Sequence, residues 1–228
     1  MRNWATRAVG ELAHRRDEIN ALNVFPVPDS DTGSNMAHTM EAAVAELDNG
    51  GDVADSLALG AVRGARGNSG MVLSQVLRGV AESTVDSVID GDVFARSLQQ
   101  AVELVDRAIA EPVEGTVITV LKAAAEAADD AEAQSGATLH SIVSAAIAAA
   151  ETALKRTPSQ LPALREAGVV DAGGAGLVIL LESLLAEIEG STGHTGLPEP
   201  DPDTELEVVF FFEGDIDTVS YTHLTLPT

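Results

Sequence analysis

Apolar residues recur along the first 190 residues at the spacing of one face of an α-helix, and short glycine- or proline-rich stretches interrupt them. This pattern predicts about eight helices of ordinary length and no β-strand before residue 190. The first 190 residues are therefore expected to form one all-α domain. The expected helices span residues 3–21, 34–47, 53–62, 71–82, 93–110, 116–133, 138–155 and 177–189.

The pattern changes after Gly190. Residues 191–204 are rich in Gly, Pro, Thr and acids, a composition typical of a linker. Residues 205–218 begin with E-L-E-V-V-F-F-F, which predicts a β-strand. Because a lone strand is not stable, this segment is interpreted as the start of a truncated α/β domain. Residues 219–228 contain no Asp, Glu, Lys or Arg and resemble the read-through translation of a sequencing adapter, so we expect a non-native tail.

The chain is strongly acidic, with 36 Asp and Glu against 13 Lys and Arg and a formal net charge of -23. This charge disfavours nucleic acids and anionic membrane surfaces as partners, because both bind clustered basic residues. A nucleotide is still compatible, since backbone N–H groups and a bound metal can hold its phosphates. The chain has no cysteine, no apolar run of bilayer length and no signal-peptide pattern. We therefore expect a cytoplasmic protein without membrane insertion.

Residues 23–36 read N-V-F-P-V-P-D-S-D-T-G-S-N-M and form the most informative stretch of the chain. Pro26 and Pro28 predict a stiff, extended loop, and a helix is expected to follow it. Asp29 and Asp31 lie two positions apart in this loop. Closely spaced carboxylates next to unsatisfied helix N–H groups suit a hard cation together with a phosphate.

Two more glycine-rich turns, at residues 64–70 and 168–176, also precede predicted helices. A simple helix cap explains any one such turn, but three in one helical domain favour a nucleotide site at the end of a bundle. None has the P-loop pattern G-x-x-x-x-G-K-[ST], and none follows a strand, which disfavours a Rossmann site. Arg63 and Arg66 bracket Gly64, and either could face a phosphate.

The first motif closely resembles N-V-F-P-V-P-D-G-D-T-G-T-N-M, the signature of the fatty-acid kinase catalytic subunit. The N-terminal domain of that family is similar to the dihydroxyacetone kinase L subunit (the DAK2 or DhaL family). G-A-R-G-N-S-G-M-V-L-S-Q from Gly64 and G-V-V-D-A-G-G-A-G-L from Gly168 resemble its second and third loops, and E-G-T-V-I-T-V from Glu114 resembles another segment. The matches run in order through nearly all of residues 1–190. The resemblance implies an eight-helix up-down barrel that binds ATP and two Mg²⁺ at one end.

The resemblance also implies a set of binding residues. Asp29 and Asp31 match two of the three acidic metal-binding positions of the dihydroxyacetone kinase relatives, and the neutral Asn23 falls at the third. Ser30 stands where the family has Gly. The positions that match ATP-binding residues of the family are Thr32, Gly33, Ser34, Asn35, Asn68, Ser69, Gly115, Thr116, Arg165, Asp171, Ala172 and Gly173.

By resemblance, the chain is expected to transfer the γ-phosphate of ATP to a fatty-acid carboxylate presented by a DegV-like carrier protein, giving an acyl phosphate. A carboxylate acceptor is already ionised, so we nominate no nucleophile and no strong general base. A dihydroxyacetone kinase L subunit is one alternative, which the strand after the linker disfavours because that subunit looks complete near Gly190. A non-catalytic adaptor with a structural nucleotide is another. We also expect a homodimer that forms through the region after the barrel.

Overall fold

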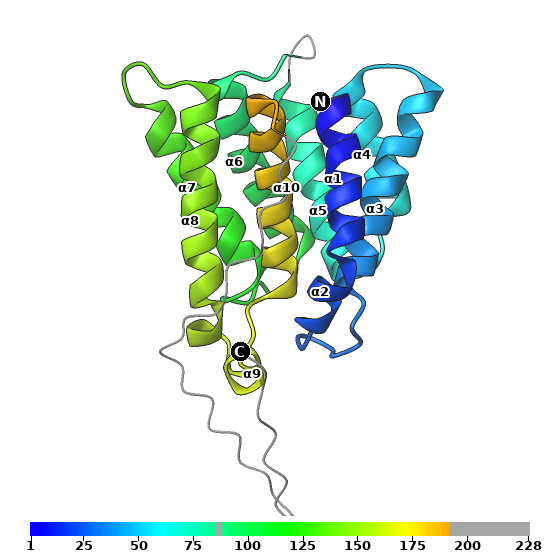
Figure 1. Cartoon of the computed structure of the whole chain (residues 1–228), viewed down its shortest axis with the longest axis vertical. Helices are drawn as coiled ribbons and strands as arrows, with labels where there is room; N and C mark the ends of the chain where they lie inside the picture. The colour runs from blue at the N-terminus through cyan, green and yellow to red at the C-terminus, as the bar shows by residue number, and fades with distance from the viewer. Residues whose placement is uncertain (85–87, 192–228) are drawn as a thin grey trace, which may run out of the picture.

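The computed structural model describes residues 1–84 and 88–191, and these residues form an all-α barrel (Figure 1). No β-strand occurs within the described ranges, in agreement with the predicted fold class. The predicted strand segment 205–218, the tail 219–228 and the linker beyond Ser191 lie outside them. The elements are α1 (Arg2–His14), α2 (Arg16–Ala21), α3 (Thr32–Glu46), the 3-10 turn η1 (Leu47–Asn49), α4 (Val53–Gly64), α5 (Gly67–Ser83), α6 (Gly91–Ala108), α7 (Val117–Glu132), α8 (Leu139–Gln160), α9 (Pro162–Ala167) and α10 (Ala172–Glu189).

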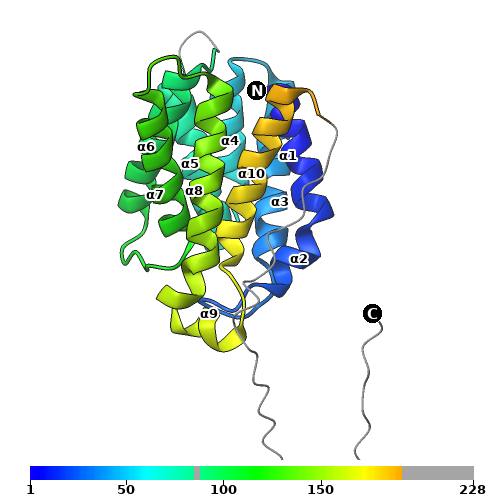
Figure 2. The same ribbon diagram turned by 60° about the vertical axis from the view of Figure 1, so that its left-hand side comes forward.

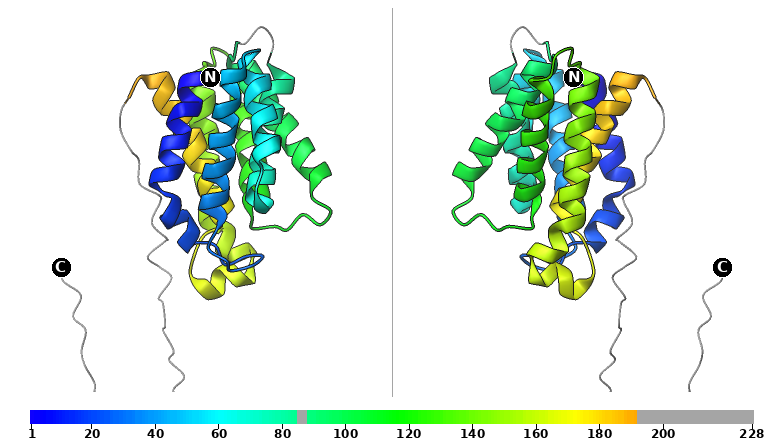
Figure 3. Two further views of the ribbon diagram at one scale, coloured as in Figure 1. Left: turned by 90° about the vertical axis from the view of Figure 1, so that its right-hand side faces the viewer. Right: turned by 90° about the vertical axis from the view of Figure 1, so that its left-hand side faces the viewer.

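The long helices alternate in direction around the barrel, which confirms the predicted up-down arrangement (Figures 1 and 2). The N-termini of α3, α5, α7 and α10 therefore gather at one end, the lower end in Figure 1. The short helices α2 and α9 and the loop after α2 lie at this same end, as Figure 3 also shows. All three glycine-rich turns consequently meet at one end of the molecule.

Several predicted helix boundaries differ from the structure; for example, α5 begins at Gly67 rather than at residue 71, and α10 at Ala172 rather than at residue 177. Two further differences have a local cause. The helix expected over 3–21 is interrupted at Arg15, whose φ of -98° and ψ of 11° separate α1 from α2. The helix expected to end at residue 155 continues through Pro158 to Gln160. Proline has no N–H group for the carbonyl four residues earlier, that of Leu154. The hydroxyl of Thr157 donates to this carbonyl at 2.7 Å instead, so the helix tolerates the proline.

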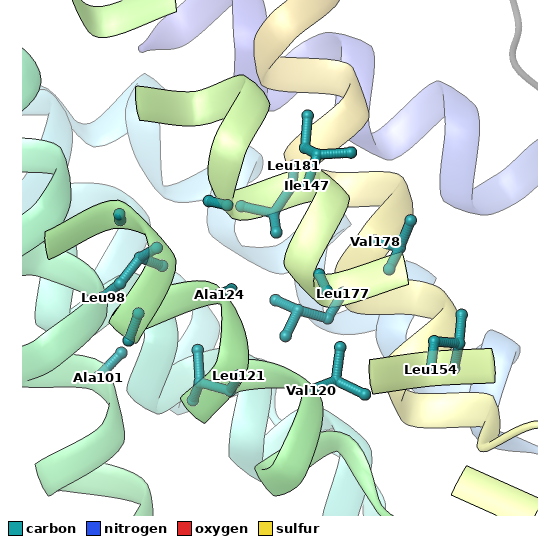
Figure 4. Packing of buried hydrophobic residues seen from close by; sticks show 14 of the residues in the cluster. Leu98, Ala101, Val120, Leu121, Ala124, Ile147, Leu154, Leu177, Val178 and Leu181 are labelled. Atoms are coloured by element: carbon teal, nitrogen blue, oxygen red, sulfur yellow. The ribbon is translucent and has the colours of Figure 1, made fainter. Parts of the chain in front are cut away.

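Two clusters of buried apolar side chains fill the barrel. One joins α5 to α8 with α10 and includes Leu98, Leu121 and Leu177, drawn in Figure 4. The other joins α1 to α5 with α10. Helix α10 contributes Val178 to the first cluster and Ile179 to the second, so its apolar sequence reflects burial on both sides. No helix within the described ranges is long and apolar enough to cross a lipid bilayer.

The last long helix closes the barrel against the first. The indole N–H of Trp4 donates to the carbonyl of Leu180 at 3.1 Å, and Arg7 forms an ion pair with Glu187 at 3.4 Å. The seam between α1 and α10 therefore joins the beginning and the end of the domain.

Candidate functional site

A pocket of ≈ 390 Å³ lies where the N-termini of α5, α7 and α10 meet the loop after α2. All three sequence motifs contribute to it, together with the connection between α6 and α7. Its walls are largely apolar, with a few hydroxyl, amide and carboxylate groups among them, which is typical of a small-ligand site. The lining residues are Phe25, Pro26, Thr32, Asn68, Ser69, Met71, Val72, Ala108, Ile109, Ala110, Glu111, Val113, Thr116, Val117, Ile118, Asp171, Ala172 and Gly173.

Asn23 organises the first loop from the interior of the protein. Its side chain is buried, and its Oδ1 accepts hydrogen bonds from the N–H groups of Asp31 (3.2 Å) and Thr32 (3.1 Å) and the hydroxyl of Thr32 (2.8 Å). Its Nδ2 donates to the carbonyl of Val27 at 3.0 Å. Three donors use the acceptor capacity of an amide oxygen. The metal-binding role of Asn23 stays a prediction, and it would require some of these bonds to break.

Asp29 and Asp31 have unengaged carboxylates. Asp29 is exposed, Asp31 is half-buried, and neither carboxylate pairs with a basic group in the part of the chain that the structure describes. Asp31 holds the N-cap position of α3 but makes no capping hydrogen bond with its side chain. Free carboxylates of this kind suit Mg²⁺, which combines a few of them with phosphate oxygens and water. The described residues contain no group of three His, Cys, Asp or Glu that could hold a metal.

The backbone between the two acids is in the left-handed region, because Ser30 has a φ of 54°. Glycine adopts this conformation without a steric penalty, whereas serine does not. The Gly that the related signature has at this position is thus explained by the geometry of the loop.

The start of α3 is fixed by α2. The side chain of Asn20 accepts from the N–H of Ser34 at 3.1 Å and donates to the hydroxyl of Ser34 at 3.0 Å. A Cβ at Gly33 would overlap the carbonyl oxygen of Arg16, so the close approach of α2 to α3 requires glycine. Gly33 and Ser34 are therefore structural parts of this turn, and neither lines the pocket in the described geometry.

The second glycine-rich turn lies directly against α3. A Cβ at Gly67, whose φ is 60°, would lie 2.6 Å from Nδ2 of Asn35. The hydroxyl of Thr39 donates to the carbonyl of Asn35 at 2.7 Å and accepts from the N–H of Arg66 at 3.4 Å. Asn35 thus joins the two turns, while Asn68 and Ser69 line the pocket. Helix α5 has no side-chain cap, so the N–H groups of its first turn are left for solvent or a ligand.

Asp171 caps α10 at the third turn. Its Oδ2 accepts from the N–H of Gly174 at 2.6 Å, and its own N–H donates to the hydroxyl of Thr157 at 3.0 Å. Burial raises the pKa of the Asp171 carboxyl from 3.8 to about 6, against the opposing effect of the hydrogen bond from the N–H of Gly174 and of the nearby backbone of Val117 and Gly173. This acid is therefore ionised at neutral pH at the expense of some folding stability.

The connection between α6 and α7 supplies the fourth wall. Gly115 has a φ of 81°, and the N–H of Gly115 donates to the hydroxyl of Thr119 at 2.9 Å. Thr116 lines the pocket, whereas Gly115 does not. Ile109 and Val113 make this wall apolar, and sequence reasoning missed them both. Ile109 lies inside the helix expected over residues 93–110, and Val113 lies just after it. An apolar residue at either place is common in packing against a core, so neither stood out as a site residue.

The arginines near the motifs have different surroundings. Arg165 does not line the pocket, because its guanidinium donates to the carbonyls of Pro158 (3.3 Å) and Ser159 (3.1 Å) at the end of α8. Arg63 forms an ion pair with Glu46 at 3.0 Å. Arg66 is exposed and has no ion-pair partner among the described residues.

The architecture and the pocket define an all-α barrel domain with a candidate ligand site at one end. A family model described as the DAK2 domain matches residues 26–186, and the chain belongs to this family. The match covers the first motif from Pro26 onward, the second and third motifs entirely and most of the barrel, so the family resemblance drawn from those motifs is confirmed.

Curated relatives support the same family. The chain is 41% identical over 187 residues to the protein YloV of Bacillus subtilis, covering 79% of the chain and 34% of YloV. It is 37% identical over 213 residues to an uncharacterized protein of Staphylococcus aureus strain USA300, covering 91% of the chain and 39% of that protein. The chain thus spans less than two fifths of the length of either relative.

Solved structures share the fold. The dihydroxyacetone kinase from C. freundii in complex with AMP-PNP and Mg²⁺ matches with a TM-score of 0.59 and 20% identity, over 82% of this chain and 33% of that chain. The native form of the same kinase matches with a TM-score of 0.57 and 19% identity, over 82% of this chain and 34% of that one. At this level of identity, the likeness establishes a common all-α barrel.

Proposed function

We propose that this domain binds ATP with Mg²⁺ and transfers a phosphoryl group to a fatty-acid carboxylate presented by a DegV-like carrier protein, giving an acyl phosphate. The observation that supports it most is the pocket itself, which the three motif turns build. Asp29 and Asp31 do not line it, but they belong to the loop whose Pro26 and Thr32 do. The C. freundii kinase of the same fold binds AMP-PNP and Mg²⁺. Two Mg²⁺ ions are the number that the family resemblance implies.

The hydrogen bonds around the pocket favour one orientation of the nucleotide. The N-terminus of α10 is already occupied by the carboxylate of Asp171, whereas α5 has no side-chain cap. Phosphates are attracted to unsatisfied N–H groups and to the positive end of a helix dipole. We therefore expect the phosphates to lie at the start of α5 near Asp29 and Asp31. The base would then contact the apolar wall that contains Ile109 and Val113.

The residues of the chain fit the chemistry of phosphoryl transfer. Such transfer depends on positioning and charge neutralisation, and bound Mg²⁺ would supply much of the neutralisation. Asn23 and Asn20 hold the loop and the start of α3 in place, which fixes the segment that carries Asp29 and Asp31. The carboxylate acceptor needs no deprotonation, so the protein need not provide a strong base.

Two other functions make different predictions. A dihydroxyacetone kinase L subunit would use a small polyol as acceptor, and a nucleotide-holding adaptor would bind ATP without turnover. The motif at residues 23–36 favours the fatty-acid kinase, because it has the P-V-P-D form of that family. The carrier, the acceptor and a homodimer are proposals for the whole protein, because the chain spans less than two fifths of the length of these relatives.

The test is product formation by the full-length protein with ATP, Mg²⁺, a fatty acid and its DegV-like carrier, with acyl phosphate trapped by hydroxylamine. Acyl hydroxamate in the wild type and its loss in Asp31→Ala support the proposal, and Asp55→Ala on the exposed face of α4 is the matched control. Phosphorylation of dihydroxyacetone instead identifies the polyol kinase. Tight ATP binding without either product identifies the adaptor.

A further inference from the structure

The segment at residues 114–119 is folded around the hydroxyl of Thr119. This hydroxyl accepts a hydrogen bond from the N–H of Gly115 at 2.9 Å and donates one to Oε2 of Glu114 at 2.7 Å. One side chain in the first turn of α7 thus binds the two residues that precede the N-cap of that helix. We call the group formed by Glu114, Gly115 and Thr119 the Thr119 clasp.

The hydrogen bond between Gly115 and Thr119 has an unusual direction. A threonine hydroxyl inside a helix ordinarily donates to the carbonyl four residues earlier, and those of Thr6 and Thr152 do so in this chain. Gly115 lies four residues before Thr119, yet its N–H group is the donor. Because the carboxylate of Glu114 takes the hydroxyl hydrogen of Thr119, the hydroxyl oxygen is left to accept. Glu114 therefore sets the direction of the bond.

Gly115 is held on its other side by the end of α8. A Cβ at Gly115 would lie 3.0 Å from Cβ of Gln160 and 3.0 Å from Cβ of Leu161, and the φ of Gly115 is 81°. Gly115 is buried, so its N–H needs a partner within the protein. The hydroxyl of Thr119 is that partner, and the clasp consequently holds the connection between α6 and α7 against α8.

The clasp lies beside the wall of the pocket. Glu114 and Thr119 do not line the pocket, whereas Val113 and Thr116 do. The hydroxyl of Thr116 donates to the carbonyl of Val113 at 2.7 Å, so these two lining residues are tied together across Gly115. A displacement of the backbone at Gly115 would therefore move both of them.

We propose that Thr119 and Glu114 are positioning residues for the nucleotide site. Their clasp on Gly115 holds Val113 and Thr116 in place as part of the wall that receives the base. This proposal rests on the proposed function, because the base is the part of the nucleotide expected at this wall. Thr119 supplies the bond to the backbone, and Glu114 keeps the hydroxyl in the accepting orientation. The carboxylate of Glu114 is engaged in this bond outside the pocket, so we assign it no contact with metal or phosphate.

Amide hydrogen exchange in the ligand-free, full-length protein tests the clasp, measured by mass spectrometry on peptides that contain Gly115. In Thr119→Val, which keeps the shape of the side chain, the N–H of Gly115 loses its acceptor, and its exchange should accelerate about fivefold or more. In Glu114→Ala, the hydroxyl of Thr119 is released to donate to a backbone carbonyl, so the same acceleration is expected. Wild-type protection of Gly115 in either variant overturns the proposal. If Thr119→Val does not fold, Glu114→Ala decides.

Two conservative variants and a distant threonine are the controls. Thr119→Ser keeps the hydroxyl, and Glu114→Gln keeps an oxygen that accepts its hydrogen, so exchange at Gly115 should stay within about twofold of the wild type in both. Thr6→Val removes an ordinary bond to the carbonyl of Arg2 on the exposed face of α1, and it should leave exchange at Gly115 unchanged. Equal acceleration in Thr119→Ser and Thr119→Val would make the hydroxyl irrelevant and overturn the proposal.

Calorimetric titration with ADP and Mg²⁺ separates a positioning role from a purely structural one. Thr119→Val and Glu114→Ala should bind ADP about tenfold more weakly than the wild type, whereas the three control variants should bind it within about twofold. Faster exchange at Gly115 with unchanged ADP affinity makes the clasp purely structural and overturns the proposal.

The Mg²⁺ concentration for half-maximal ADP binding should be the same in Glu114→Gln and the wild type. A changed Mg²⁺ requirement makes Glu114 a metal ligand and overturns the proposal. If the wild type binds no ADP, the proposed function fails, whereas the exchange experiment still decides whether the clasp forms.

Discussion

The hydroxyl of Thr157 accepts a hydrogen bond from the N–H of Asp171 at 3.0 Å and donates one to the carbonyl of Leu154 at 2.7 Å. This one buried side chain repairs the break that Pro158 makes in α8 and holds the start of α10 beside it. Thr157→Val keeps the shape of the side chain and leaves both backbone groups without a partner. We expect a loss of about 2 kcal/mol in the free energy of unfolding, measured by urea denaturation.

The control for this change is Thr152→Val on the same helix. Thr152 is exposed, and among the described residues its hydroxyl bonds only to the carbonyl of Ala148. Its replacement should change stability by less than about 0.5 kcal/mol. Equal losses in the two variants would contradict the structural role of Thr157.

Asn23→Ala should destabilise the ligand-free protein, because the N–H groups of Asp31 and Thr32 and the carbonyl of Val27 lose their partner. The expected loss is about 2 kcal/mol in urea denaturation. The exposed Asn3 provides the control, and Asn3→Ala should have almost no effect. Unchanged stability combined with a lost Mg²⁺ requirement would instead support the metal-binding role predicted for Asn23.

Ser30→Gly should increase stability. The left-handed φ of Ser30 is unfavourable for any residue with a Cβ, and glycine removes that strain at a cost in unfolded-chain entropy. The net gain expected is up to about 1 kcal/mol in thermal denaturation. The reverse change, Gly168→Ser at the left-handed C-cap of α9, should cost a similar amount. A less stable Ser30→Gly would show that the serine side chain makes a useful contact.

The stability of the wild type relative to Asp171→Asn should depend on pH. The folded pKa of Asp171 is raised from 3.8 to about 6, so the folded state holds this proton more tightly than the unfolded state. The contribution of protonated Asp171 to the free energy of unfolding is therefore fully present below pH ~4, and it is lost as the pH rises through about 6. The stability difference should shift by roughly 2 kcal/mol against the wild type between pH 4 and pH 7, measured by urea denaturation at each pH. A constant difference would contradict burial of an ionisable carboxyl at this site.

Arg66→Ala should weaken ATP binding about tenfold if phosphates lie at the start of α5. Arg66 is the N-cap of that helix, and in the described part of the chain no carboxylate competes for its guanidinium. Arg63→Ala is the control, because the ion pair with Glu46 already engages that side chain. Calorimetric titration measures both variants. Equal affinities for Arg66→Ala and the wild type would place the phosphates elsewhere.

The fold was predictable because apolar spacing marks helices even without strong caps. The third glycine-rich stretch was harder to interpret, because it was expected to be a loop as far as residue 176, yet α10 begins at Ala172. A Cβ at Gly176 would overlap the sulfur of Met36, and one at Gly174 would lie 2.8 Å from a methyl group of Val120. These glycines permit close helix packing, and a sequence alone does not distinguish that need from a turn.

The sequence predicted which segments form the site better than it predicted the role of each residue in it. Sequence motifs placed Thr32, Asn68, Ser69 and Asp171 correctly at one end of a barrel, and all four line the pocket. The motif could not show that the side-chain amide of Asn23 forms hydrogen bonds within the loop, because these bonds depend on the path of the backbone between Val27 and Thr32. The binding roles themselves stay predictions.

The seam between Trp4 and Leu180 also has a consequence for biosynthesis. Helix α1 packs against α10, which is synthesised well after it, and α10 supplies side chains to both core clusters. The earlier helices therefore lack one wall of their core until translation has passed residue 189. Nascent chains that stall before this point would expose the apolar faces of α1 and α8, which makes them natural clients for chaperones that act at the ribosome.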